Sequence, residues 1–327
     1  MPTTAPGSTT VAHYGLGPIG LAIAGLAADR GHRIVAAVDI DPEKTGRDLG
    51  ALLGRGALGV TVTNDVSAAL ATRPRIVFHS TQSHLREVTP QLLTIIESGA
   101  SVISTCEELA FPWYHHPHEA RKIDEAAKAR GISVVGLGVN PGFVMDLLPI
   151  VLSAPCREIR TVHVTRVVDA GRRRLPLQRK VGAGMTRAEF ENGVASGRIG
   201  HVGLKESVAM IADALGWRLD SIEERIEPVL EGTTVRGLHQ VAAGRRDDRQ
   251  GSADRPAITL DLTMAIDAPD PKDAVVLDGD PPISMTVAGG IHGDVATCAL
   301  AVNAVPRVLA APPGLTTVHR LPPIHGA

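Results

Sequence analysis

Hydrophobic residues in the first 140 positions fall into two alternating kinds of pattern. Short apolar runs rich in valine, isoleucine and alanine predict β-strands at 9–14, 33–38, 59–62, 75–79, 101–104 and 133–137. Between them, apolar positions recur every three or four residues, which predicts helices at 19–28, 84–98 and 117–130 and helix starts at 41–43 and 64–65. This alternation is typical of a doubly wound parallel sheet, the α/β Rossmann fold.

After residue 140 the pattern changes to one that is rich in strands. Residues 258–266 alternate apolar with small or polar side chains, and further strands are predicted at 158–168, 233–242 and 283–288. Two helices are predicted within this region, at 186–195 and 203–215, and a final helix at 294–309. We therefore expect a Rossmann domain at 1–140, an α+β domain at 141–293, and a C-terminal helix and tail at 294–327 that pack back on the first domain.

Composition is consistent with a two-domain globular protein and argues against several other classes. The chain has 327 residues, of which 44% are hydrophobic, 21% charged and only 2% aromatic, and its net charge is −2. We expect no nucleic-acid partner, because neither a positive field nor a set of stacking aromatic rings is present. The three cysteines are widely spaced, which indicates neither a disulfide framework nor a zinc site. The first ten residues do not resemble a secretory signal and no uncharged apolar run reaches about 18 residues, so we expect a cytoplasmic protein without a membrane span.

A glycine-rich turn follows the first predicted strand and gives the first indication of a ligand. The sequence Gly15-Leu-Gly17-Pro-Ile-Gly20 has the spacing of a dinucleotide fingerprint, in which the glycines allow a tight turn, a close approach to a pyrophosphate, and helix packing. Asp39 ends the second strand, 19 residues after Gly20, at the spacing of an acid that binds the adenosine ribose. Asp39 favours NAD, but Lys44 and Arg47 follow closely and are able to reach a 2′-phosphate, so NADP stays open.

Polar residues follow three later strands, at the edge of the sheet where such folds bind their ligands. After the fourth strand come Ser80, Thr81 and Gln82, which offer hydroxyl and amide groups to the cofactor. After the fifth strand two adjacent acids, Glu107 and Glu108, are placed where the nicotinamide is expected. Because neighbouring side chains of an extended segment point to opposite sides, at most one of these two acids is expected to face the substrate.

Six segments together resemble one enzyme family. They are the Gly15 fingerprint, HSTQSH at 79–84, STCEEL at 104–109, GVNPGFVMD at 138–146, GHVGLKES at 200–207 and GIHGD at 290–294. These segments resemble 2,4-diaminopentanoate dehydrogenase and the native amine dehydrogenases, which are relatives of dihydrodipicolinate reductase. The resemblance spans nearly the whole chain. It implies a Rossmann domain, an α+β substrate domain, a homodimer, and NAD(P)-dependent oxidative deamination of a primary amine, with reductive amination of a ketone or aldehyde by ammonia in reverse.

The resemblance also implies site residues. A glutamate that holds the amine nitrogen in that family is carried over to Glu108, with Glu107 in reserve, and His201 is a further candidate for substrate contact. The candidate cofactor residues are Gly15, Leu16, Gly17, Pro18, Ile19, Asp39, Ser80, Thr81, Gln82, Cys106, Asn140 and Asn303. No metal site is expected, since the histidines at 115, 116 and 118 lack a completing ligand set and fit a surface helix start.

Two alternatives stay open. The enzyme could act on an amino acid such as 2,4-diaminopentanoate, for which Arg166, Arg172, Arg173, Arg174 and Arg179 are possible carboxylate partners. Alternatively, the chain could be a dinucleotide-binding sensor without catalysis, although a sensor has no need of the acid pair. Consumption of NAD(P)H with and without ammonia separates these readings.

Overall fold

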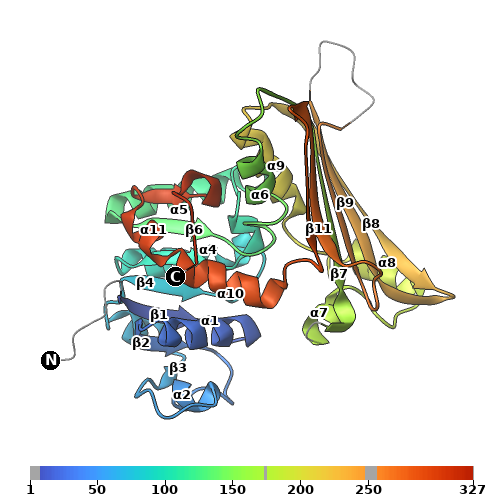
Figure 1. Cartoon of the computed structure of the whole chain (residues 1–327). Coiled ribbons are helices and arrows are strands. Elements are labelled where there is room, and N and C mark those ends of the chain that lie inside the picture. Colours follow the sequence, from blue (N-terminus) through green and yellow to red (C-terminus); the bar gives the residue numbers. More distant parts are fainter. Residues whose placement is uncertain (1–7, 173–174, 247–255, 327) are drawn as a thin grey trace. The chain divides into compact units, whose positions relative to one another are not determined.

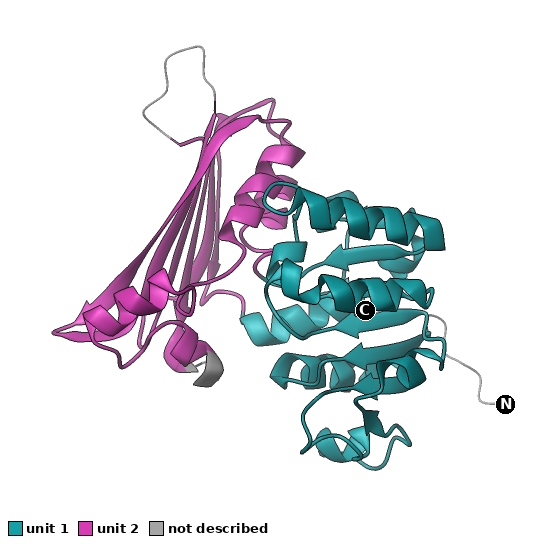
Figure 2. Ribbon diagram, turned by 180° about the vertical axis from the view of Figure 1, so that it is seen from behind, with its two compact units in different colours: residues 1–139, 292–327 teal, residues 140–291 magenta. Residues whose placement is uncertain are grey.

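The structure is a computed structural model that describes residues 8–172, 175–246 and 256–326. The chain forms two compact units, which are coloured separately in Figure 2. Unit 1 comprises Met1–Val139 and His292–Ala327, and unit 2 comprises Asn140–Ile291. The chain therefore crosses from one unit to the other twice, after Val139 and after Ile291.

Unit 1 is built on a parallel sheet that has seven strands within the described residues, in the order β13-β6-β5-β4-β1-β2-β3 (Figure 1). The bounds are β1 (Thr10–Tyr14), β2 (Arg33–Val38), β3 (Val62–Thr63), β4 (Ile76–His79), β5 (Ser101–Ser104), β6 (Ser133–Gly136) and β13 (Gly314–Thr316). The chain starts in the interior of the sheet at β1 and winds outward in both directions, which confirms the predicted Rossmann fold.

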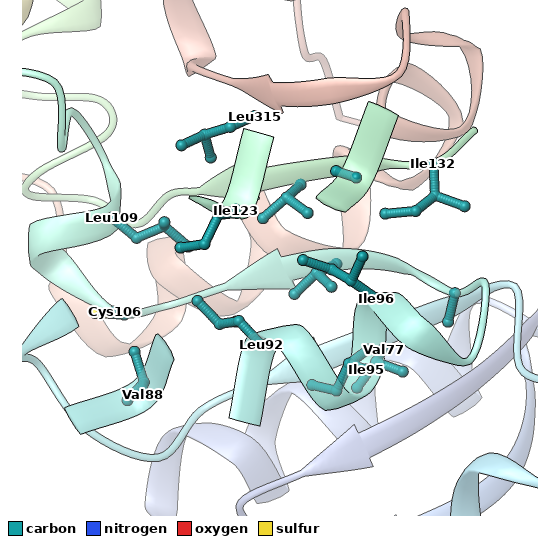
Figure 3. Packing of buried hydrophobic residues seen from close by; sticks show 14 of the residues in the cluster. Val77, Val88, Leu92, Ile95, Ile96, Cys106, Leu109, Ile123, Ile132 and Leu315 are labelled. Carbon is teal, nitrogen blue, oxygen red and sulfur yellow. The ribbon is translucent and has the colours of Figure 1, made fainter. Parts of the chain in front are cut away.

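Helices cover both faces of this sheet (Figure 2). They are α1 (Pro18–Asp29), α2 (Leu49–Leu52), α3 (Val66–Leu70), α4 (Leu85–Glu97), α5 (Pro117–Arg130), α10 (Gly293–Asn303) and α11 (Val305–Ala310), with 3₁₀ turns η1 (Glu107–Leu109) and η3 (Val318–Arg320). The stripe Val88, Leu92, Ile95 and Ile96 of α4 is fully buried against the sheet (Figure 3). Each such side chain contributes roughly 1.5–3 kcal/mol of burial energy, so this core fixes α4 relative to β4 and β5.

The segment after β2 differs from its predicted form. Turns follow Asp41 instead of the predicted helix, and the short α2 begins only after Asp48. The Asp48 carboxylate accepts hydrogen bonds from the backbone of Gly50 (2.8 Å), Leu58 (2.9 Å) and Val60 (3.2 Å). The bonds to Leu58 and Val60 span 10 and 12 residues of the chain, so contacts distant in sequence override the local helix signal. The third strand moves correspondingly, from 59–62 to Val62–Thr63.

β13 was not predicted, because it is three residues long and follows two prolines. Leu315 pairs with Val134 of β6, and the backbone N–H of Leu315 donates to Asp124 of α5 at 3.0 Å. The Ser133 hydroxyl also lies within hydrogen-bond distance of the carbonyl oxygens of Ala311 and Pro312. The strand therefore forms because it pairs with the edge strand β6 and is held by Asp124 of α5.

Unit 2 is a mixed sheet that has six strands among the described residues, in the order β12-β11-β7-β10-β9-β8. Its elements are α6 (Leu147–Leu152), β7 (Glu158–Asp169), η2 (Ala170–Arg172), α7 (Leu175–Lys180), α8 (Arg187–Ala195), α9 (Leu204–Ala214), β8 (Leu219–Glu231), β9 (Thr234–Arg246), β10 (Ile258–Ala265), β11 (Lys272–Asp280) and β12 (Ile283–Ala288). Neighbouring strands are antiparallel except β7 and β10. The pattern did not predict β8 and β11, whose charged residues mask the period-two alternation.

The two faces of the unit 2 sheet differ. Alternate side chains such as Leu238, Leu260 and Val275 are fully buried, on the face that packs against α9. The opposite face carries half-exposed, mostly small or uncharged residues: His163, Thr165, His239, Val241, Ala243, Thr259, Asp261, Thr263 and Ala274. This open face is a natural candidate for an interface.

One helical stretch of the described chain, Gly293–Ala310, is long and apolar enough to span a membrane, with a mean hydropathy of 1.2. It comprises α10 and α11, of which α10 packs against α1 and α11 against β5 and β6. Its apolar composition is accounted for by these contacts, and we interpret it as a core helix pair of unit 1.

The buried histidines of the sheet give unit 1 a pH-dependent stability. His13 on β1 stacks on Phe78 with ring centroids 5.1 Å apart, and neither ring nitrogen has a hydrogen-bond partner among the described residues. Burial, with a smaller effect of His32, lowers the pKa of His13 from 6.5 to about 3. As the pH drops, His13 gains a proton near pH 6.5 in the unfolded chain but only near pH 3 in the folded protein. The free energy of unfolding therefore falls as the pH drops below 6.5.

We expect His13→Leu to remove about 2 kcal/mol of the stability loss that the protein shows between pH 7.5 and pH 5. Urea unfolding at the two pH values measures this difference. Parallel pH profiles for the variant and the parent protein would contradict a neutral, buried His13.

Candidate active site

In the glycine turn after β1, a side chain would have space at Gly17 but would collide with backbone atoms at Gly15 and Gly20. Gly15 has φ +93°, and a Cβ there would lie 2.4 Å from the carbonyl oxygen of Ser80. A Cβ on Gly20 would lie 2.0 Å from the Gly15 carbonyl oxygen. At Gly17, the N-cap of α1, no atom lies within 4 Å of the Cβ position. The start of α1 thus faces open space, which fits a phosphate group at the helix N-terminus.

The other predicted residues of this turn have different surroundings. Leu16 is fully buried in a small core, and its backbone N–H donates to Asp39 Oδ2 at 2.6 Å. Pro18 is at the first helical position, where the missing N–H costs nothing. The Ile19 carbonyl oxygen lies 3.8 Å from the Cys298 sulfur of α10. Leu16 and Ile19 therefore shape the turn through contacts inside unit 1.

Asp39 follows β2 and is nearly buried, with 9% of its surface exposed. Its Oδ1 accepts from the Asp41 N–H at 2.8 Å, and its Oδ2 lies 3.4 Å from Lys44 Nζ. Lys44 also lies 3.1 Å from the Asp41 carboxylate. An oriented carboxylate suits ribose hydroxyls, while the lysine beside it weakens repulsion of a 2′-phosphate, so these two side chains suit either cofactor.

The loop after β4 packs tightly on the glycine turn. The Ser80 N–H donates to the Tyr14 carbonyl at 2.8 Å, and the Ser80 hydroxyl has no partner within the described chain. The Thr81 hydroxyl donates to Gln91 Oε1 at 2.9 Å. Gln82 is exposed. Ser80 and Thr81 are thus held at the edge of the sheet beside the turn, at the place where the sequence predicted cofactor contacts.

The two adjacent acids have unlike surroundings. Glu108 Oε2 accepts from the Leu85 N–H at 2.7 Å and lies 3.1 Å from His116 Nε2, while Oε1 lies 2.9 Å from His84 Nδ1. Leu85 is the first residue of α4, so Glu108 caps that helix from a distance. Only 15% of its side chain is exposed. Both carboxylate oxygens of Glu108 are therefore engaged in holding α4 and α5 together.

Glu107 has no such anchors. Its side chain is half-buried, and among the described residues its carboxylate makes no hydrogen bond or ion pair, although its carbonyl oxygen accepts from Ala110 N at 3.1 Å. The preceding Cys106 is buried, and its thiol lies 3.2 Å from the Ser83 carbonyl oxygen. Burial, followed by the nearby Glu107 charge, raises the pKa of the Cys106 thiol. Cys106 is therefore a neutral structural thiol, and Glu107 is the acid with capacity for a ligand.

Two predicted residues belong to unit 2. The Asn140 amide nitrogen contacts only the Met145 sulfur at 3.2 Å in the described chain, and its amide oxygen is buried without a partner there. Both amide atoms therefore have capacity for a ligand. The backbone N–H and carbonyl of His201 are both held at 2.8 Å by the side chain of Gln240, which is fully buried.

Asn303 is the last residue of α10. It lies six residues beyond Thr297, whose hydroxyl accepts from the Val139 N–H at 3.1 Å near the end of β6. Six residues advance a helix by about 9 Å, so Asn303 lies away from that point. No contact of the structure supports its predicted role, which stays a prediction from sequence.

Of the arginines and histidines that the sequence singled out, Arg166 and His116 have structural partners. Arg166 is 3% exposed, pairs with Asp273 at 2.6 Å, and donates to the Ile291 carbonyl at 2.8 Å. Arg179 is exposed at the end of α7, whereas Arg173 and Arg174 lie outside the described residues. His116 was expected only as part of a surface helix start, but its contact with Glu108 ties α5 to the acid loop. Among the described residues no group of three or more His, Cys, Asp or Glu is arranged to hold a metal ion.

Sequence reasoning assigned no role to four residues that shape this site, His79, His84, Gln91 and Ser104, although three of them lie in the motifs at 79–84 and 104–109. A polar residue at the end of an apolar strand, as at His79 and Ser104, is the signal that could have found two of them. The contacts of His84 and Gln91 depend on how α4 packs, which no local pattern reports.

Comparison with known proteins shows which family the chain resembles along its length. The family model for the 2,4-diaminopentanoate dehydrogenase C-terminal domain matches residues 143–327. The 2,4-diaminopentanoate dehydrogenase of Acetoanaerobium sticklandii is 30% identical over 311 residues, covering 86% of this chain and 88% of that protein. An amine dehydrogenase of Streptomyces virginiae is 30% identical over 327 residues, covering 91% and 90% of the two chains.

A solved structure supports the same relationship. The amine dehydrogenase from Mycobacterium smegmatis superimposes with a TM-score of 0.86 at 25% identity, over 98% of this chain and 97% of that one. These matches confirm the resemblance seen in the sequence motifs. The chain belongs to the 2,4-diaminopentanoate dehydrogenase and amine dehydrogenase family of NAD(P)-dependent oxidoreductases.

Proposed function

We propose that this protein catalyses the NAD(P)-dependent oxidative deamination of a primary amine and, in reverse, the reductive amination of a small ketone or aldehyde with ammonia. The observation that carries the proposal is the difference between two adjacent acids. Glu108 is bound at both oxygens, whereas the Glu107 carboxylate makes no hydrogen bond or ion pair among the described residues. One acid thus supports the loop and the other is available to a substrate nitrogen.

The residues of the glycine turn fit a dinucleotide. The open space before Gly17 suits the pyrophosphate, Asp39 suits the adenosine ribose, and Ser80 and Thr81 suit the adjoining ribose and phosphate. The chemistry that the bound nicotinamide supplies is hydride transfer. The remaining tasks, which are to bind the amine, move its protons and stabilise its positive charge, fall to the protein.

Glu107 suits these tasks. An alkylammonium ion has a pKa close to that of lysine, about 10, so the substrate arrives protonated and must lose a proton before its carbon gives up a hydride. A carboxylate beside the nitrogen attracts the ammonium, accepts the proton, and then stabilises the iminium cation that oxidation produces. We therefore assign this role to Glu107, which the sequence held in reserve, and assign to Glu108 the support of α4.

The surroundings of Arg166 favour a substrate without a carboxylate. An amino acid substrate needs a cationic partner, and Arg166 is already paired with the buried Asp273. Separating this pair would leave a buried charge uncompensated, at a cost of several kcal/mol. A simple amine is therefore the substrate class that we propose, with 2,4-diaminopentanoate-like amino acids as the alternative.

We expect NAD(P)H consumption with small ketones and aldehydes to depend on ammonia. A panel of these carbonyls and amino ketones, with and without ammonium, measures it by absorbance at the nicotinamide band. Consumption without ammonia would favour an alcohol or imine chemistry. Firm cofactor binding with no turnover would favour the sensor.

Matched substitutions of the two acids separate catalysis from support. We expect Glu107→Gln to lower kcat by about 10²- to 10⁴-fold, the usual contribution of acid–base catalysis, without changing the melting temperature. Glu108→Gln replaces the carboxylate beside the Leu85 N–H and two histidines with a neutral amide. We expect it to lower the free energy of unfolding by about 1–3 kcal/mol and to lower kcat less than tenfold.

Steady-state kinetics, thermal unfolding and nicotinamide fluorescence titration measure these effects. The reverse outcome, an inactive Glu108→Gln beside an active Glu107→Gln, would return the catalytic role to Glu108.

We further propose that a second copy of the chain covers the open face of the unit 2 sheet. Within the described face the acid Asp261 lies 3.0 Å from His239 Nε2, and small uncharged residues surround these two side chains. A sheet face with few charges buries area at low desolvation cost. The proposed partner is the same chain, as the resemblance implies.

Val241→Glu places a like charge beside Asp261, its registered neighbour on β10, and we expect it to convert the dimer to a monomer in light scattering. Val151→Glu is the matched control, because Val151 of α6 is 60% exposed and lies on another element. A Val241→Glu protein with unchanged mass would rule out this face.

A further inference from the structure

A chain of buried hydrogen bonds runs beneath the loops that follow β4 and β5. His79, the last residue of β4, is fully buried, and its Nδ1 lies 2.9 Å from the hydroxyl of Ser104, the last residue of β5. His79 Nε2 lies 2.8 Å from Gln91 Oε1 of α4. The Ser104 oxygen in turn accepts from the Cys106 N–H at 3.1 Å, and the Thr81 hydroxyl donates to Gln91 Oε1.

The donors and acceptors of this chain specify one proton arrangement. Gln91 Oε1 only accepts, so His79 Nε2 carries the ring proton and Nδ1 is the acceptor. The Ser104 hydroxyl donates to Nδ1 and keeps its oxygen for the Cys106 N–H. Burial lowers the pKa of His79 to about 4, so the ring is neutral at physiological pH. A protonated ring would turn Nδ1 into a donor and reverse the direction of its hydrogen bond with the Ser104 hydroxyl.

We propose that His79 is a positioning residue that fixes the acid-bearing loop 105–108 on one side and the cofactor loop 80–83 on the other. The inference rests on the proposed catalytic role of Glu107. One arm of the chain passes through Ser104 to the Cys106 N–H, directly before Glu107. The other joins Nε2 to Thr81, both directly, with Nε2 3.0 Å from the Thr81 hydroxyl, and through Gln91.

The arm through Ser104 matters because Glu107 lacks an anchor of its own. Its side chain contacts no hydrogen-bond partner within the described residues, so the backbone of its loop decides where the carboxylate lies. The His79 carbonyl also accepts from the Thr105 N–H at 2.9 Å, so His79 holds the loop through both its ring and its backbone. A misplacement of about 1 Å is enough to lower a rate by roughly 10²-fold.

Two substitutions separate the arms, because an asparagine amide reaches the position of Nδ1 and a glutamine amide reaches that of Nε2. We expect His79→Gln to lose the Ser104 arm, lowering kcat for reductive amination about 10- to 100-fold while the cofactor Kd changes less than about threefold. We expect His79→Asn to lose the Gln91 arm, raising the cofactor Kd several-fold with kcat kept within about threefold. Equal losses of kcat and cofactor affinity in both variants would show a merely structural histidine and overturn the proposal.

Ser104→Ala is the second test of the catalytic arm. It should reproduce the kcat loss of His79→Gln, and the double variant should be no slower than either single variant, since both break the same link. Additive losses would contradict the link. Melting temperatures of all variants show whether each protein is folded.

The role of His79 can also be tested without enzyme turnover, so that its failure is distinguishable from failure of the proposed amine dehydrogenase activity. Long-range ¹H–¹⁵N correlation spectra of histidine-labelled protein, assigned by the His79→Asn variant, should show His79 as the neutral Nε2–H tautomer from pH 8 to pH 5. The other tautomer, or a charged ring, would overturn the network. An enzyme that is inactive on every carbonyl but shows this tautomer would disprove the proposed function and leave the network in place.

Discussion

The close approach of two backbone segments at Gly15 is the constraint on which the cofactor end of unit 1 depends. A Cβ atom at Gly15 would lie only 2.4 Å from a carbonyl oxygen, and one at Gly20 only 2.0 Å. A side chain at either position would push β1 away from Ser80 or α1 away from the turn, since real Cβ atoms do not approach so closely. Gly17 is different, because it has open space in front of it. The first and last glycines thus make the fold possible and the middle one leaves room for a ligand.

Hydrogen-bond partners distinguish the two acids after β5. A carboxylate has about four lone-pair sites, and Glu108 directs its oxygens at a helix N-terminus and two histidines. These contacts join β5, α4 and α5 into one rigid edge. Glu107 lies in the same loop, and its carboxylate makes no hydrogen bond or ion pair among the described residues. Because the position of the Glu107 carboxylate depends on the backbone of its loop, the proposed role of Glu107 depends on the hydrogen bonds that His79 and Ser104 make to that loop.

Unit 2 shows how buried charge can order irregular segments. Asp146 is fully buried and accepts from the Ser207 hydroxyl at 2.7 Å and from the backbone of Gly142 and Leu147. Burial raises the pKa of Asp146 and these hydrogen bonds oppose the rise. Asp273 likewise binds the Ile291 N–H at 2.7 Å while its partner Arg166 holds the Ile291 carbonyl. Each acid therefore fixes the backbone close to one of the two chain crossings, after Val139 and after Ile291.

The sequence by itself determined the Rossmann order of strands and helices in unit 1, the dinucleotide turn, the acid pair, and the family. These features depend on local periodicity, on glycine spacing, and on short motifs, all of which are visible along the chain. The sequence did not determine β8, β11 and β13, or the start of α2. The charged residues of β8 and β11 hide their alternation, and the three-residue β13 forms only against the β6 edge that already exists. Nor could it decide between Glu107 and Glu108. Neighbouring acids have the same local signal, and only the packing of α4 and α5, which brings His84, Leu85 and His116 to one of them, makes their chemistry different.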